Sequence, residues 1–132
     1  MVQIVNYGNS NDYGLNYNFN FVQKLELKVL IKRDYKELIH ILMPDGAWKS
    51  AVILACSILE AILHDQLTSD RYNQLALTCS SAPKLRADVK PIDECKLVEM
   101  ITVAEKIEYL PPQRAKSIDQ VLRDYRNFVH PL

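Results

Sequence analysis

The sequence predicts an all-α protein, an up-and-down four-helix bundle that follows a loosely ordered N-terminal arm. Four segments carry apolar residues at steps of three and four positions, which is the period of an amphipathic helix. The 132-residue chain also has only 3 glycines, too few for the turns that many short strands need. The length supports one domain, which we expect at residues 19–132 after an arm at residues 1–18.

The arm differs in composition from the rest of the chain. It is rich in asparagine and tyrosine, among them Asn6, Asn9, Asn11, Asn16, Tyr7, Tyr13 and Tyr17. It has no lasting helical or alternating period, so we expect loose order, with only residues 2–5 able to pair as a short strand.

A first helix is expected over residues 19–43, ended by Pro44. Four lysines on it step by four residues and form a basic ridge beside Arg33: Lys24, Lys28, Lys32 and Lys36. Acidic residues interrupt this ridge, which favours a solvated face of mixed charge. Phosphate would be its natural ligand if it binds one.

A second helix is expected over residues 46–68, with Asp45 as its cap. It is apolar almost all round, so we expect it to be covered on most sides, either as the central helix of the fold or as half of a dimer contact. Its longest apolar run, residues 51–63, contains Ser57 and Glu60 and is shorter than the roughly 20 residues of a membrane span. We therefore expect no membrane association.

The remaining chain predicts two further helices. Residues 69–92 read as a connection in which Tyr72, Leu75, Ala76 and Leu77 could form a short helix. A third helix is expected over residues 93–108, with Asp93 as its cap. Pro111 and Pro112 then open the fourth helix, and Pro131 stops it.

Composition excludes several classes of function. The 16 basic residues balance 16 acidic ones, so the chain lacks the basic surplus of a protein that coats a phosphate backbone. Its 3 cysteines have neither disulfide-framework nor metal-knuckle spacing, and no secretory signal is visible, which together favour the cytoplasm. The sequence has no glycine-rich phosphate-binding loop, no H-E-x-x-H zinc-binding helix and no G-x-S-x-G nucleophile turn, so we expect no metal and no cofactor.

One polar stripe stands out on the fourth helix. Asp119, Arg123, Arg126 and His130 follow one another at spacings of four, three and four residues, which makes their side chains neighbours beside the apolar face. A histidine in a last turn beside two guanidinium groups could act as a general acid or base next to an anion clamp. The structural alternative is a solvated flank with a weak Asp119–Arg123 ion pair.

The second helix carries a matching stripe of Ser50, Ser57, Glu60 and His64. Glu60 lies in a run of apolar residues, where burying an unpaired carboxylate would cost several kcal/mol of folding free energy. We therefore expect it to pair with Arg123, Arg126 or His130 across the bundle.

The run from Leu122 to Pro131 closes the chain and resembles the signature of the HEPN superfamily. Its pattern is an arginine, a polar residue and then a histidine after four to six positions. Arg123, Asp124 and His130 meet it, whereas Arg126 and Asn127 resemble the commoner Arg-Asn opening with one intervening residue too few. Both arginines stay candidates. The hydrophobic second helix with Glu60 also resembles related HEPN-like bundles.

The resemblance implies a dimeric helical bundle, and in many members a metal-independent ribonuclease. His130 would then transfer a proton, Arg123 or Arg126 would stabilise phosphate charge, and the supporting polar residues would be Glu60, Asp119, Asp124 and Asn127. The expected partners are a second copy of the chain and RNA. The alternative is a non-catalytic scaffold, or the partner of a nuclease, toxin or nucleotidyltransferase encoded nearby. The irregular spacing to His130, only two residues from the end, favours this alternative.

Overall fold

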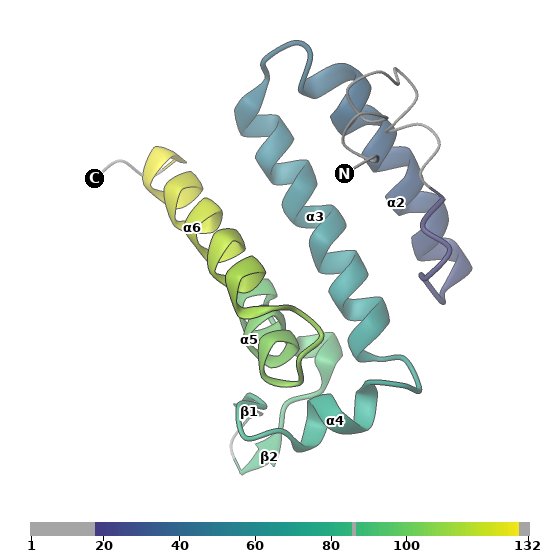
Figure 1. Cartoon of the computed structure of the whole chain (residues 1–132), viewed down its shortest axis with the longest axis vertical. Coiled ribbons are helices and arrows are strands. Elements are labelled where there is room, and N and C mark those ends of the chain that lie inside the picture. Colours follow the sequence, from purple (N-terminus) through teal and green to yellow (C-terminus); the bar gives the residue numbers. More distant parts are fainter. Residues whose placement is uncertain (1–17, 86, 130–132) are drawn as a thin grey trace. The chain divides into compact units, whose positions relative to one another are not determined.

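The computed structural model describes residues 18–85 and 87–129 of the chain (Figure 1). This part is mostly helical, with five α-helices and one two-stranded hairpin, in agreement with the all-α prediction. The arm up to residue 17, with its expected strand, lies outside the described residues. The chain divides into two compact units, Met1–Ile58 and Leu59–Leu132, and the boundary falls inside helix α3.

In the first unit, α2 covers Leu25–Glu37 and begins later than the sequence predicts. Phe19 has a φ of 52°, a left-handed conformation that a helix does not accommodate. Phe19 is buried, and its ring lies edge-on against Tyr35 with centroids 5.1 Å apart. The residues before α2 therefore form a turn folded against the helix.

The end of α2 widens into a π-helical turn, η1, over Leu38–Leu42. The N–H of Met43 donates to the carbonyl of Leu38 at 3.0 Å, a five-residue step. Gly46 then adopts a φ of 71°, a backbone conformation that glycine adopts without strain. Helix α3, Trp48–Leu67, begins three residues after Asp45, so the prediction that Asp45 caps it is wrong.

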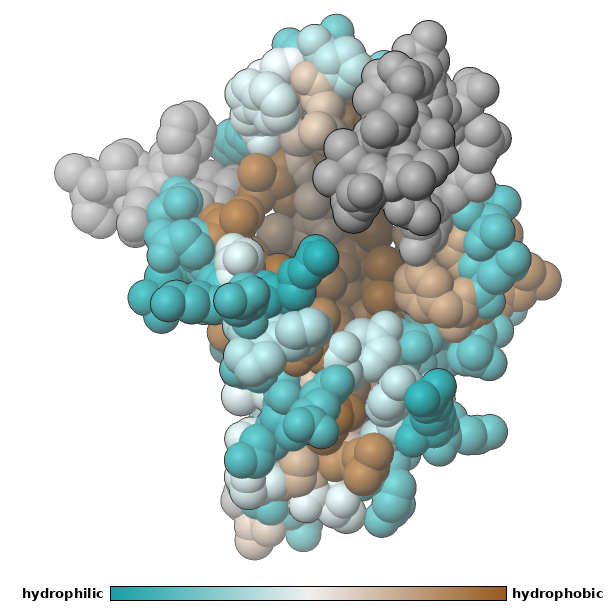
Figure 2. Space-filling model, in the orientation of Figure 1, coloured by the Kyte–Doolittle hydropathy of each residue, from teal (hydrophilic) through white to brown (hydrophobic). Residues whose placement is uncertain are grey.

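Helix α3 is less covered than its composition suggests. Ala51, Ile58 and Leu63 are buried, but Trp48 is 61% and Ile53 49% exposed. Apolar side chains thus remain on the surface of the described chain (Figure 2). The expectation that α3 is the covered central helix is wrong for its first half, because its apolar residues point around the whole helix while segments of the same chain bury only part of it. The alternative, half of a dimer contact, stays a prediction.

By length and composition, α3 is also the one helix in the described ranges that could cross a membrane. This is weak evidence by itself, because the core helix of a soluble protein passes the same test.

The second unit holds the main hydrophobic core. After α3 come α4 (Asn73–Thr78), strands β1 (Lys84–Leu85) and β2 (Asp88–Val89), the 3-10 turn η2 (Ile92–Glu94), α5 (Leu97–Lys106) and α6 (Pro112–Val129). The core residues are Leu63, Leu67, Ala76, Ile92, Cys95, Met100, Ile101, Val103, Ala104 and Ala115. They come from α3, α4, α5, α6 and the η2 region, which explains why these segments hold together.

Two details of this unit differ from the sequence prediction. The short antiparallel hairpin, with Lys84 opposite Val89, was not predicted. Each strand has two residues, which is too short to show an alternation of apolar and polar side chains. Asp93 lies in η2 rather than at a helix cap, and the Glu99 carboxylate instead accepts the N–H of Lys96 at the start of α5. The predicted helix near Ala76 and the proline start of α6 are both confirmed.

Candidate functional site

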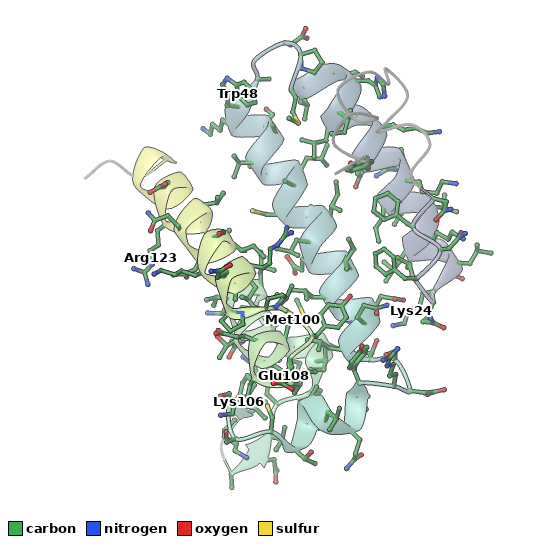
Figure 3. The ribbon with its side chains drawn as sticks, in the orientation of Figure 1. Lys24, Trp48, Met100, Lys106, Glu108 and Arg123 are labelled. Atoms are coloured by element: carbon green, nitrogen blue, oxygen red, sulfur yellow. The ribbon has the colours of Figure 1, made fainter. Side chains whose placement is uncertain are left out.

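Arg123 is an exposed cation of the α6 stripe and lies among the described side chains. Its Nε lies 2.9 Å from Oδ2 of Asp119, one helical turn earlier, and the two side chains are 68% and 42% exposed. Figure 3 shows Arg123 projecting outward from α6. An arginine has five N–H donors, so this contact through Nε leaves the outer Nη groups for an anion.

Asp124 belongs to a second contact on α6. It is exposed, and its Oδ1 accepts a hydrogen bond at 2.9 Å from Nε2 of Gln120. The side chains of Arg126 and Asn127, and the whole of His130, lie outside the described residues. The structure therefore brings Asp119 and Arg123 together, while the place of Arg126, Asn127 and His130 stays a prediction.

Glu60 does not have the surroundings that the sequence suggests. It is exposed on α3, and so are Ser50 and Ser57 of the same stripe. The expectation of a buried carboxylate in need of an ionic partner is wrong, because neighbouring segments leave this side of α3 open to water. Glu60 remains a surface charge that can meet a ligand or a partner.

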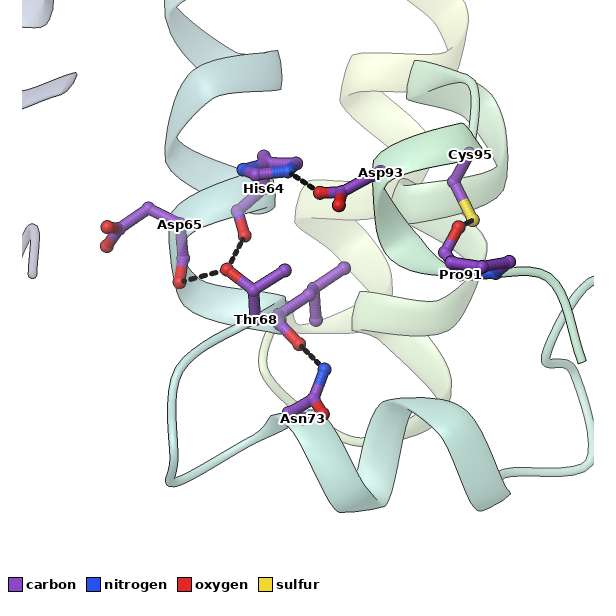
Figure 4. A network of polar contacts seen from close by, with 8 residues as sticks. His64, Asp65, Thr68, Asn73, Pro91, Asp93 and Cys95 are labelled. Atoms are coloured by element: carbon purple, nitrogen blue, oxygen red, sulfur yellow. Dashed lines mark hydrogen bonds and ion pairs between the residues drawn. The ribbon is translucent and has the colours of Figure 1, made fainter. Parts of the chain in front are cut away.

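His64, the last member of that stripe, has a partner that sequence reasoning missed. Its Nε2 lies 2.5 Å from Oδ1 of Asp93, and this contact joins the end of α3 to η2 (Figure 4). The two residues are 29 positions apart, so no local spacing could have indicated the pair. Asp93 is 78% exposed and His64 31% exposed, so water reaches part of this contact.

Polar side chains also close the C-terminal end of α3 (Figure 4). The Thr68 hydroxyl donates to the carbonyl of His64 at 2.7 Å, and Nδ2 of Asn73 donates to the carbonyl of Leu67 at 3.0 Å. Asp65 is fully buried beside them, with its Oδ2 accepting from Nε2 of Gln66 at 3.0 Å. The last carbonyls of the helix are thus satisfied without glycine, and this region is structural.

A third polar group lies at the start of α5. Nζ of Lys90 meets Oε1 of Glu99 at 3.0 Å, and both side chains are partly buried. The N–H of Lys96, and then Lys90, hold the pKa of Glu99 below its usual value. Burial, followed by the nearby Glu99 charge, raises the pKa of the Cys95 thiol. A thiol with a raised pKa is a poor nucleophile, so Cys95 acts as a core residue.

The second unit also has a cleft of about 600 Å³ where α5 ends and α6 begins. Its lining includes Thr102, Glu105, Lys106 and Glu108, but neither Asp119 nor Arg123. The α6 stripe is therefore displayed on an open surface rather than in this cleft. Within residues 18–85 and 87–129, no three His, Cys, Asp or Glu side chains group closely enough to hold a metal ion.

Comparisons with protein-family models, with curated proteins and with solved structures found no match to this chain.

Proposed function

We propose that this chain is a HEPN-like up-and-down bundle that cleaves RNA without a metal ion. The observation that carries the proposal is Arg123, an exposed guanidinium oriented by Asp119 on a helix that continues to Val129, directly before His130. Helical spacing puts Arg126 on the same stripe. A cationic group that stabilises phosphate charge, together with a histidine that transfers a proton, can catalyse phosphate chemistry at a ribose.

The reaction follows from these groups. His130 takes the proton of the ribose 2′-hydroxyl, whose oxygen then attacks the adjacent phosphorus. The bond from phosphorus to the 5′-oxygen breaks, and the proton passes to that oxygen, which leaves a cyclic phosphate and a free 5′-hydroxyl. Arg123 or Arg126 stabilises the charge that accumulates on the phosphate oxygens.

A homodimer would make such a site effective. Trp48 and Ile53 stay exposed on α3, which supports a second copy of the chain as their cover. If the two α6 stripes face each other in a two-fold dimer, a chain of zero net charge concentrates several cations at one site. The expected location is the reducing cytoplasm, because the three cysteines are free thiols in the structure.

The test is cleavage of a single-stranded RNA by the purified chain in the presence of a chelator. We expect His130→Ala to lower the rate by roughly 100-fold or more, the contribution of a general acid or base. Arg123→Ala should cause a loss of about the same order, because it removes charge stabilisation. Arg114→Ala is the matched control, because it removes an exposed arginine of α6 that lies about 180° around the helix from Arg123, and it should keep wild-type activity. Unchanged cleavage by His130→Ala would refute the proposal.

One observation favours the non-catalytic scaffold as a second candidate. Asp119 already offsets part of the Arg123 charge, as in an ordinary surface ion pair. In a scaffold, Asp119→Ala and Arg123→Ala would alter stability slightly and to a similar extent, and the wild-type chain would leave RNA intact. In the nuclease, Asp119→Ala would change the rate of RNA cleavage.

A further inference from the structure

A shallow groove of about 630 Å³ runs along α2 and η1 within the first unit. Lys32, Arg33, Lys36 and His40 supply its basic side chains, and Val29 and Ile41 supply its apolar ones. Glu37 is the one acidic residue among the described side chains that line it. The groove is distinct from the α6 stripe and does not depend on the proposed nuclease activity.

The π-helical turn accounts for this combination of residues. On a regular α-helix, Val29 and Ile41 would lie about 120° apart, because each residue advances about 100°. Each residue of a π-helix advances by less, since its hydrogen bonds span five residues instead of four. His40 would lie only about 20° from Val29 on a regular helix, so the turn η1 matters for Ile41, which it brings back toward the face that carries Val29 and Lys36.

The apolar residues of the groove are open to a ligand. Val29 is 59% and Ile41 55% exposed, and Leu25, one turn before Val29, is 70% exposed. Exposed apolar residues gathered on one surface are typical of a binding site. This face of the first unit thus carries apolar area that the described chain does not bury.

The charge of the groove is positive. Arg33 is partly offset, because its Nη2 lies 2.9 Å from Oδ1 of Asp34. Lys32 and Lys36 make no ion pair with any side chain that the structure describes. Two lysines one turn apart therefore remain to attract negative charge beside the apolar floor.

An RNA strand matches this surface poorly. Proteins that hold single strands combine basic groups with aromatic side chains on which the bases stack. The described lining of the groove holds no Phe, Tyr or Trp, and the imidazole of His40 is its one aromatic ring. Phosphate alone would leave Val29 and Ile41 without a role. A lipid surface also matches poorly, since an interfacial helix presents a broad apolar face separate from its charges.

We propose that this groove binds an acidic amphipathic helix of a partner protein. Apolar side chains of that helix would pack on Val29 and Ile41, while its carboxylates would meet Lys32 and Lys36. Val29 and Ile41 are separated by about 18 Å along the axis at 1.5 Å per residue, which is about three turns of a bound helix.

The test uses a fluorescein-labelled 14-residue peptide with leucine on one helical face and glutamate on the flanks. Fluorescence anisotropy with the full chain should show binding that weakens as salt is raised. A peptide with lysine in place of each glutamate should not bind. Lys32→Glu combined with Lys36→Glu should weaken binding at least about tenfold, and Val29→Ser by several-fold. Arg114→Glu with Lys116→Glu makes the same charge change on α6 and should have no effect.

Three outcomes would overturn this proposal. The first is an acidic peptide that does not bind, and the second is binding unaffected by the Lys32 and Lys36 reversals in a variant with wild-type circular dichroism. The third is preferential binding of an oligouridylate or of phosphatidylserine vesicles that the same reversals abolish. His130→Ala should leave peptide binding intact, so the two proposals can fail separately.

Discussion

Glu99 fixes the beginning of α5 through two contacts of different kinds. Its carboxylate accepts the N–H of Lys96 at 2.8 Å and meets the Lys90 ammonium at 3.0 Å. Both contacts favour the ionised form, and they lower the pKa of Glu99 in the folded chain. The stabilisation is therefore present above the ordinary unfolded glutamate value of about 4.3 and is lost as the pH falls through the folded pKa.

This linkage leads to a prediction for Glu99→Gln. The variant should have a lower melting temperature than the wild type at pH 7, because an amide cannot pair with Lys90 as a carboxylate does. The difference should shrink below about pH 4.3 and then close, once the wild-type carboxyl is protonated. Thermal unfolding across pH measures this effect. Glu105→Gln, an exposed change on the same helix, is the control. A pH-independent difference would contradict the linkage.

At the scale of elements, α5 shows how one helix divides between core and surface. Met100, Ile101, Val103 and Ala104 are buried, whereas Val98 is 48% exposed. Its apolar period was readable in the sequence. Its start was not, because Asp93 resembles a cap while the capping group is the Glu99 carboxylate. Similarly, the period of α2 was visible, but the turn before it depends on burial of Phe19.

Two valines of α5 allow a matched test. Val103 is fully buried, so Val103→Ala should lower the free energy of unfolding by roughly 2 kcal/mol through lost burial and a small cavity. Val98→Ala is the same chemical change at an exposed position and should cost less than about 0.5 kcal/mol. Urea denaturation compares the two. Equal losses would show that α5 does not bury the face that the structure gives it.

At the scale of the whole molecule, the two units differ in how much hydrophobic core stabilises them. The main core cluster belongs to the second unit, while α2 in the first unit buries one residue, Ile31. Amides of α5 should therefore exchange hydrogen at rates close to those of global unfolding, and those of α2 should exchange faster. Hydrogen-exchange mass spectrometry resolves the two helices. Equal protection of α2 and α5 would contradict this prediction, because it would mean that something covers the first unit.

The same measurement also tests the groove on α2 and η1, because added acidic peptide should slow hydrogen exchange in α2 alone.

The sequence by itself determined the features that depend on residues close together in the chain. The helical periods, the start of α6 at Pro112 and the Asp119–Arg123 pair follow from spacings of a few residues. Only the tertiary structure decided the exposure of Glu60, the His64–Asp93 contact and the groove on α2 and η1. Burial and long-range pairing depend on which distant segments pack against a residue, and local pattern does not contain that information. The groove depends in addition on the five-residue hydrogen bond between Leu38 and Met43, which the spacing of apolar residues does not reveal.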